Sequence, residues 1–208
     1  MYVSAEIQIQ PWIGTSYGQS IPRILVLGDS HHGDEGSAYA DFTIDIINSY
    51  LVGTQPSFAF FTRIMATIAN SDHWLVDKRK FYNSIIFMNL AEGVPVISSG
   101  LRPSEASFIE GKSKISSVLQ DHRPDIVFCC GRDVERVIHS IFLLEPRAPI
   151  SRDGLTANVA KLGASFFFFS KHPSWSYRRA WRDVFESFIA EIGMAQQMKS
   201  AREQWTMS

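Results

Sequence analysis

Four short apolar runs divide the chain, and in each of them the apolar residues are continuous rather than alternating with polar ones. The runs are "RILVLG" (23–28), "NSIIFMN" (83–89), "DIVFCCG" (125–131) and "SFFFFS" (165–170). Continuous runs of this length, rich in branched and aromatic residues, are typical of strands that are buried on both faces, as in a parallel sheet. The pattern therefore predicts a central four-stranded parallel sheet.

Segments with the spacing or end signals of helices separate and follow these runs. Ser37 and Ser104 are candidate N-caps, and Gly53 is a candidate stop. An alternation of strands and helices is typical of right-handed crossover units. We therefore expect an α/β fold, a three-layer α/β/α sandwich. The predicted helices cover residues 37–53, 56–70, 102–122, 132–144 and 176–194.

Length and composition indicate one domain. The chain has 208 residues, of which 45% are hydrophobic, and this is enough to bury one full core. We expect a single domain over residues 1–208, with its core at about 22–195 and a flexible tail over 196–208. Residues 145–163 are expected to form a long surface excursion before the last strand.

Charge and apolar patterning exclude several classes of protein. The 20 basic and 21 acidic residues nearly cancel, which excludes a strongly basic coat but allows a local basic patch. The first residues have no signal-peptide pattern, and no apolar run is long enough to span a membrane. We expect a soluble, cytoplasmic monomer without a membrane partner. The adjacent Cys129 and Cys130 are expected to be buried, inert thiols.

Polar residues follow three of the four predicted strands. Asp29 comes after the first strand, Asn89 ends the second, and His172 follows the fourth. Because the carboxyl ends of parallel strands meet at one edge of a sheet, we expect these three side chains to lie close together.

One hypothesis starts from the "GDS" sequence at 28–30, which resembles the first block of the SGNH (GDSL-type) hydrolases. Ser30 would then be the nucleophile of an esterase. Such enzymes need a histidine that is oriented by an acid, usually in an Asp-x-x-His element near the C-terminus. The residues before His172 are Phe169, Ser170 and Lys171, so the acid is absent at that offset.

A second hypothesis rests on three motifs in order. "GDSHHG" (28–33), "IIFMN" (85–89) and "KHPSW" (171–175) together resemble the uracil-DNA glycosylase superfamily. Members carry a first motif such as GQDPYHG or GEAPG, an asparagine at the end of the second strand, and an HPS motif after the fourth. The resemblance covers residues 22–190. It implies a uracil-DNA-glycosylase-like fold and a monofunctional DNA glycosylase, which removes a flipped-out base to leave an abasic site without a metal or cofactor.

The resemblance also implies roles for individual residues. Asp29 would position the attacking water, Asn89 would read the base, and His172 would stabilise the departing base. "GDSHHG" is one residue shorter than GQDPYHG, but Asp29 is the motif's carboxylate in either alignment. His31 or His32 takes the place of the tyrosine that rejects a 5-methyl group. This departure favours a modified pyrimidine over uracil. Relatives of this kind act on hypermodified cytosines of phage DNA as antiviral glycosylases.

A flipped base also needs an aromatic side chain on which to stack. Phe60, Phe61 and Phe81 lie between the first two motifs, where the family keeps its stacking phenylalanine, and we assign this role to Phe61.

The segment after the fourth strand combines basic and aromatic residues. "KHPSWSYRRAWR" (171–182) contains no acid, and the resemblance implies that the loop after HPS inserts a side chain into DNA and touches phosphate. A solvated helix face with a core tryptophan is the other interpretation, and a catalytically inactive DNA-binding module is a further alternative. The expected DNA-contacting residues are Lys171, Ser174, Trp175, Tyr177, Arg178 and Arg179.

Overall fold

The strands form one mixed sheet in the computed structural model, which describes residues 8–19, 21–31, 39–53, 59–91, 103–173 and 179–207. The order of the seven strands is β1-β3-β2-β4-β7-β6-β5. They are β1 (Trp12–Ile13), β2 (Ile24–Gly28), β3 (Ile85–Asn89), β4 (Ile126–Cys130), β5 (Glu145–Arg152), β6 (Leu155–Leu162) and β7 (Ser165–Ser170).

All four predicted strands are present, and they pair in parallel. β2 lies between β3 and β4, and β4 pairs with β7. The prediction that the sheet has only these four strands is wrong. β1 adds an antiparallel strand beside β3, and β6 and β5 add two more beyond β7. The sheet is therefore parallel at its centre and antiparallel at both sides.

Residues 145–163 form the β5–β6 hairpin, so the prediction of a surface excursion is also wrong. On β6, Leu155, Ala157 and Val159 are buried, because every second side chain of a strand faces the core. The turn is made by Asp153 and Gly154, both with positive φ, at 49° and 75°. An Asp-Gly pair accepts this conformation readily.

The helices confirm the expected alternation of strands and helices. α1 ends at Gly53, whose φ of 81° gives the left-handed stop, and Ser104 caps α4 by accepting a hydrogen bond from the N–H of Ser107. The cap predicted at Ser37 lies outside the described residues. The helices are α1 (Phe42–Val52), α2 (Ala59–Ile68), the 3₁₀ helix η1 (His73–Leu75), α3 (Lys78–Asn83), α4 (Glu105–His122), α5 (Arg132–Ile141), α7 (Ala180–Glu191) and α8 (Ala195–Trp205).

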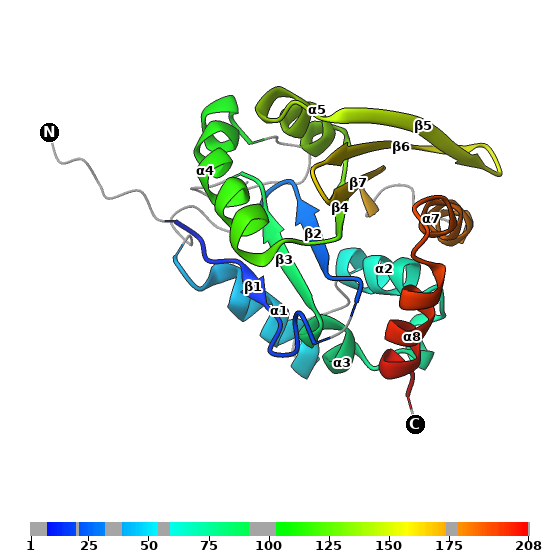
Figure 1. Ribbon diagram of the computed structural model, residues 1–208. Coiled ribbons are helices and arrows are strands. Elements are labelled where there is room, and N and C mark those ends of the chain that lie inside the picture. The colour runs from blue at the N-terminus through cyan, green and yellow to red at the C-terminus, as the bar shows by residue number, and fades with distance from the viewer. Residues whose placement is uncertain are drawn as a thin grey trace, which may run out of the picture.

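The elements form three layers, as expected. Figure 1 shows α4 and α5 on one side of the sheet and α1, α2 and α7 on the other. Successive side chains of β2 face the two sides of the sheet in turn. Leu25 and Leu27 pack with the apolar residues of α4 and α5, whereas Ile24 and Val26 pack with those of α1, α2 and α7. This double burial explains why the central strands are continuously apolar.

The C-terminal segment is a packed helix, which overturns the prediction of a flexible tail. Met198, Ala201 and Trp205 on α8 are 0%, 1% and 2% exposed. Their spacing puts them on one face of the helix, which joins the core cluster on the α2 side of the sheet. Thr206 then forms a β-bridge with Val76.

Two further features bear on the sequence predictions. Cys129 and Cys130 are buried free thiols, and burial raises the pKa of both well above its ordinary value. Among the residues that the structure describes, no helix has both the length and the apolar character needed to cross a membrane.

Candidate functional site

The carboxyl ends of β2 and β3 bring two of the predicted site residues to the same edge of the sheet. Gly28, the last residue of β2, pairs with Asn89, the last residue of β3, and Asp29 follows Gly28 directly. The N–H of Ala91 donates to the carbonyl oxygen of Asp29 at 2.8 Å, which extends the pairing beyond both strands. The backbone that carries Asp29 is thus fixed by its neighbour strand.

His172 reaches the same place from β7. Its Nε2 atom lies 3.8 Å from Oδ1 of Asp29, and the two side chains are 23% and 27% exposed. The separation is longer than a hydrogen bond, so the imidazole and the carboxylate face each other without a direct bond. The N–H of Ser30 donates to the same Oδ1 at 2.7 Å and orients the carboxylate.

Asn89 lies over the backbone of Gly28. A Cβ atom built on Gly28 would lie only 2.1 Å from Oδ1 of Asn89, so the amide occupies the space that any side chain at position 28 would need. Asn89 is 6% exposed, yet its side chain makes no hydrogen bond within the part of the chain that the structure describes. The amide has two N–H donors and a carbonyl acceptor, the groups that reading the edge of a base would use.

The aromatic residue beside this group is Phe60, not Phe61. The ring of Phe60 lies 5.2 Å from that of His172, at an angle of 31°. Its Cζ atom lies 3.6 Å from the Cβ position of Gly28. Phe61 instead is 6% exposed and packs in the core against Tyr82 and Phe87. Neighbouring residues on a helix point about 100° apart, so one faces the site and the other the core.

Helix α2 also holds the backbone next to His172. The guanidinium of Arg63 donates from Nη1 to the carbonyl oxygen of Pro173 at 2.8 Å. Arg63 lies one turn after Phe60, and both contact the segment after β7. Gly131 also lies next to His172, because Cβ and Cδ2 of His172 are 3.7 Å from its Cβ position, an ordinary contact distance. The φ of Gly131 is 112°, a conformation that favours glycine. Sequence reasoning missed Arg63, because only the fold shows which residue faces Pro173.

His31 packs against α1. Its Nε2 atom is 3.0 Å from Oγ1 of Thr43, and its ring meets that of Phe42 edge-on at 4.8 Å. His31 is 6% exposed, as buried as Asn89, whereas the side chains of His172 and Asp29 are 23% and 27% exposed. His32, the other candidate for this role, lies outside the described residues.

Ser30 makes no side-chain hydrogen bond to a histidine among the residues that the structure describes. Its Oγ atom is buried and has no hydrogen-bond partner among the residues that the structure describes. A catalytic serine needs a histidine within hydrogen-bonding reach to take its proton. The histidine at this edge of the sheet, His172, instead faces Asp29.

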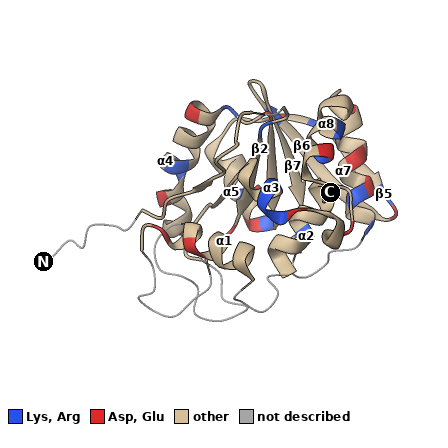
Figure 2. Cartoon of the chain, turned by 90° about the horizontal axis from the view of Figure 1, so that it is seen from below, with Lys and Arg blue, Asp and Glu red and all other residues tan. Residues whose placement is uncertain are grey.

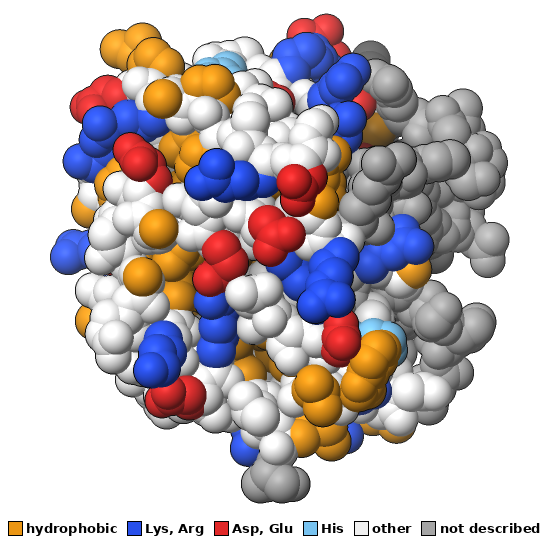
Figure 3. Space-filling model, turned by 90° about the vertical axis from the view of Figure 1, so that its right-hand side faces the viewer, with side chains coloured by type: hydrophobic (Ala, Val, Ile, Leu, Met, Phe, Trp, Pro, Cys, Tyr) orange, Lys and Arg blue, Asp and Glu red, His pale blue; other side chains and the backbone are white. Residues whose placement is uncertain are grey.

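Only two of the six predicted DNA-contacting residues fall in the described part of the chain. Lys171 and Arg179 are both exposed and stand on either side of the undescribed residues 174–178. Ser174, Trp175, Tyr177 and Arg178 lie outside the described residues. Figure 3 views the side of the molecule that carries α7 and α8, and there basic and acidic side chains are interspersed. On this side of the molecule, contact between basic side chains and DNA phosphate would therefore be limited to a small area.

No protein-family model matches the chain, and no curated protein matches it either.

Proposed function

We propose that this protein is a monofunctional DNA glycosylase of the uracil-DNA glycosylase type, acting on a pyrimidine that has been flipped out of the helix. One observation carries the proposal. A carboxylate, an amide and an imidazole, from Asp29, Asn89 and His172, come to the same carboxyl edge of the parallel strands. These are the three groups that the proposed reaction would use to hold water, to read the base and to stabilise the departing base.

Each group has a task in the reaction. Cleavage of the bond leaves positive charge on the sugar and negative charge on the base, so a carboxylate near the sugar stabilises the cation and holds the attacking water. Asp29 takes this task. His172 stabilises the departing base, and the amide of Asn89 pairs with the hydrogen-bonding edge of the base. Phe60 replaces Phe61 as the proposed stacking residue, because its ring lies beside His172.

The proposed substrate is a modified pyrimidine, with uracil as the simpler case. This choice rests on the first motif, in which a histidine stands where the family's tyrosine rejects a 5-methyl group. We propose hypermodified cytosine in phage DNA as such a substrate, and the biological role would then be antiviral defence. DNA is the only partner that this reaction requires.

The two alternatives make different demands on the site. An esterase would depend on Ser30, and the absence of a hydrogen-bonding partner for its Oγ among the described residues disfavours that role. A catalytically inactive DNA-binding module would bind DNA without cleaving any base. The same set of variants separates all three functions.

The deciding experiment incubates the protein with DNAs of different base chemistry, including phage DNA with hypermodified cytosine and an oligonucleotide containing uracil. Abasic sites are then scored by alkaline cleavage. We expect cleavage of at least one DNA, and a loss of about 10²–10⁴-fold in rate for Asp29→Asn, which keeps the shape and removes the charge. Asp153→Asn, in the exposed β5–β6 turn, is the matched control and should cleave normally.

Two results would contradict the proposal. If no DNA of the panel gains abasic sites, the glycosylase assignment is wrong. If Asp29→Asn cleaves as fast as the parent, the site is wrong even though the activity is present. Loss of p-nitrophenyl ester hydrolysis in Ser30→Ala would instead support the esterase.

A further inference from the structure

A pocket lies at the other end of the sheet, away from the candidate site. Its volume is about 300 Å³, and three segments distant in sequence build it. Ser84, immediately before β3, lies at its wall, whereas Asn89 at the far end of the same strand belongs to the candidate site. The pocket is therefore separate from the proposed glycosylase chemistry.

Hydrogen bonds between backbones hold the three segments together. The N–H of Ser16, in the turn after β1, donates to the carbonyl oxygen of Asn83 at 2.7 Å. The N–H of Asp77, just before α3, donates to the carbonyl oxygen of Trp205 at the end of α8, also at 2.7 Å. The walls are thus part of the folded framework rather than side chains on an open surface.

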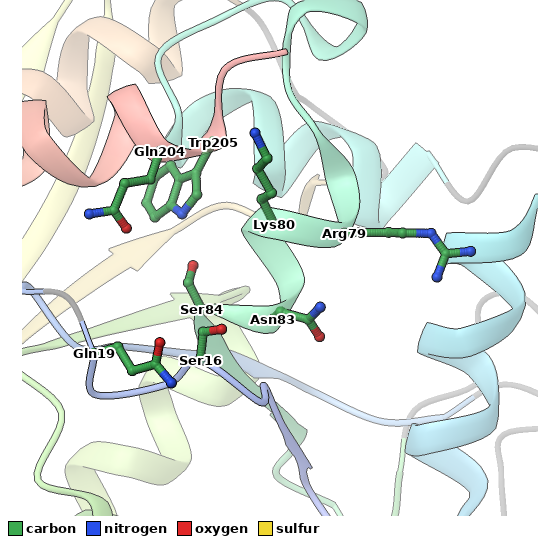
Figure 4. A pocket seen from close by; sticks show the side chains of 8 residues that line it. All are labelled: Ser16, Gln19, Arg79, Lys80, Asn83, Ser84, Gln204 and Trp205. Carbon is green, nitrogen blue, oxygen red and sulfur yellow. The ribbon is translucent and has the colours of Figure 1, made fainter. Parts of the chain in front are cut away.

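The charged groups of the lining are both cations. Arg79 and Lys80 on α3 line the pocket, and no carboxylate of the described residues does. Figure 2, which views this end of the molecule, marks basic residues on α3. The acid nearest in sequence, Asp77, caps α3, and its carboxylate accepts hydrogen bonds from the backbone N–H groups of Arg79 and Lys80. The guanidinium of Arg79 makes no ion pair with any residue that the structure describes, and Figure 4 shows it directed away from the other lining side chains, so it would have to turn to reach a ligand in the pocket. Nζ of Lys80 lies 3.5 Å from the carbonyl oxygen of Thr206.

Five further residues of the lining are polar and neutral. Amides and hydroxyls both donate and accept hydrogen bonds, which suits a ligand with several hydroxyl groups. Figure 4 shows these side chains around the pocket, coming from the turn after β1, from the junction of α3 and β3, and from α8. They are Ser16, Gln19, Asn83, Ser84 and Gln204.

The wall contributed by α8 holds an unpartnered donor. Trp205 is 2% exposed, and its Nε1 atom is buried without a hydrogen-bond partner in the described part of the chain. In Figure 4 the nitrogen is on the edge of the indole that faces the Ser84 side of the pocket. A buried N–H without an acceptor is costly, and an acceptor atom of a ligand bound against this wall would remove that cost.

We propose that this pocket binds a sugar phosphate. The phosphate would be held by Arg79 and Lys80, and the sugar hydroxyls by the neutral side chains. A volume of about 300 Å³ is larger than inorganic phosphate needs and lies at the lower end of the range for small-molecule sites. Free sugar phosphates and the 5′-phosphorylated end of a nucleic acid share this chemistry.

The experiment titrates the intact protein with ribose 5-phosphate and follows the indole N–H signals by NMR, with the Trp205 signal assigned from Trp205→Phe. Ribose and inorganic phosphate are titrated in parallel, because each carries only half of the proposed recognition. A short oligonucleotide, with and without a 5′-phosphate, tests the second source. We expect saturable shifts of the Trp205 signal with ribose 5-phosphate and at least tenfold weaker binding of ribose and of inorganic phosphate.

Charge-removing variants locate the binding. The double variant Arg79→Gln/Lys80→Gln should weaken binding of ribose 5-phosphate by tenfold or more, since charge-assisted hydrogen bonds are the strong ones. Lys199→Gln, at an exposed position of α8 outside the lining, is the control and should bind as the parent does.

Each outcome decides the proposal. Tighter binding of the 5′-phosphorylated oligonucleotide would support it and identify a nucleic acid end as the source. Absence of saturable shifts at millimolar ribose 5-phosphate would overturn it. Equal affinity for inorganic phosphate, or equal weakening by Lys199→Gln, would reduce the effect to general attraction of anions and would also overturn it.

Discussion

The imidazole of His172 and the carboxylate of Asp29 face each other across 3.8 Å. Asp29 follows β2, the first parallel strand of the chain, whereas His172 follows β7, the last. The parallel sheet is what brings them together, because β2 and β7 both pair with β4 in the same direction. The contact between His172 and Asp29 defines the centre of the candidate site. Variants of Asn89, Gly28 and Arg63 test the residues around it.

Asn89→Ala should lower kcat/KM for DNA cleavage by about tenfold to a hundredfold, the usual effect of losing hydrogen bonds that read a base. Stability should change little, because the Asn89 amide makes no hydrogen bond within the described residues that the variant would break. Steady-state kinetics and thermal unfolding of the same samples check both statements. Asn48→Ala, exposed on α1, is the control. An unchanged kcat/KM would remove Asn89 from the site.

Gly28→Ala should destabilise the protein by about 1–3 kcal/mol, since the new methyl group would meet Oδ1 of Asn89 at 2.1 Å. The double variant Gly28→Ala/Asn89→Ala should recover most of that loss, because the colliding atom is gone. Urea unfolding of the parent, the two single variants and the double variant measures the coupling. Strictly additive effects would show that the two residues do not collide.

Arg63→Gln should lower kcat by about tenfold or more with a smaller change in KM, because misplacement of a catalytic group affects the chemical step. The variant removes the hydrogen bond to Pro173 and leaves His172 itself intact. Single-turnover and steady-state cleavage assays separate the two parameters. Arg136→Gln, mostly exposed on α5, serves as the control. A rise in KM alone would point to DNA contact instead.

Asp125 and Arg23 join the starts of β4 and β2, and this pair gives a pH-dependent prediction. Arg23 donates to Asp125 from its backbone N–H, Nε and Nη2. Burial by itself would raise the pKa of Asp125, but the hydrogen bonds and charge of Arg23 outweigh it and hold the pKa below its ordinary value. The lowered pKa means that the folded state binds the proton less readily than the unfolded state does.

The stabilisation by this pair is therefore present above the unfolded-state pKa of about 3.9 and is lost as the pH falls through the lower folded-state value. Asp125→Asn should be less stable than the parent by about 1–2 kcal/mol near pH 7, a figure kept small because Arg23 is partly exposed. The difference should shrink near pH 3. Chemical unfolding at both pH values measures it, and a constant difference would show that ionisation of Asp125 is not the cause.

Met198→Ala should lower the free energy of unfolding by about 2–5 kcal/mol, the usual cost of emptying a fully buried site. Met198 is 0% exposed on the face of α8 that joins the core. Gln197→Ala, exposed on the same helix, should be nearly neutral. Equal stability of the two variants, measured by denaturant unfolding, would mean that α8 does not contribute to the core.

The central part of the fold was predictable because its signal is strong. β2, β3, β4 and β7 are buried on both faces, and only continuous apolar runs satisfy that environment. β5 was not predicted, because it is an exposed outer strand with a largely polar sequence. Its turn did carry a signal, the Asp153-Gly154 pair, which is typical of a tight hairpin.

The same contrast holds for α8 and for the site. Three buried residues on α8 are separated by polar ones, so the segment has the composition of a tail although Met198, Ala201 and Trp205 have helical spacing. Asp29, Asn89 and His172 were predicted to share one edge because parallel strands leave them no other place. Phe60 and Arg63 depend on which face α2 turns toward the sheet, and the spacing of α2 alone does not decide that.

Within the described part of the chain, the outer strand β5 pairs with β6 alone, and its sequence contains Pro146 and Pro149. Neither proline has an N–H group, so a strand from a second molecule that approached this border would find two donors missing. We therefore expect these prolines to oppose one common route to fibrous association in concentrated solution, the addition of strand upon strand. Replacing both prolines by threonine would restore those donors and create a border open to such growth.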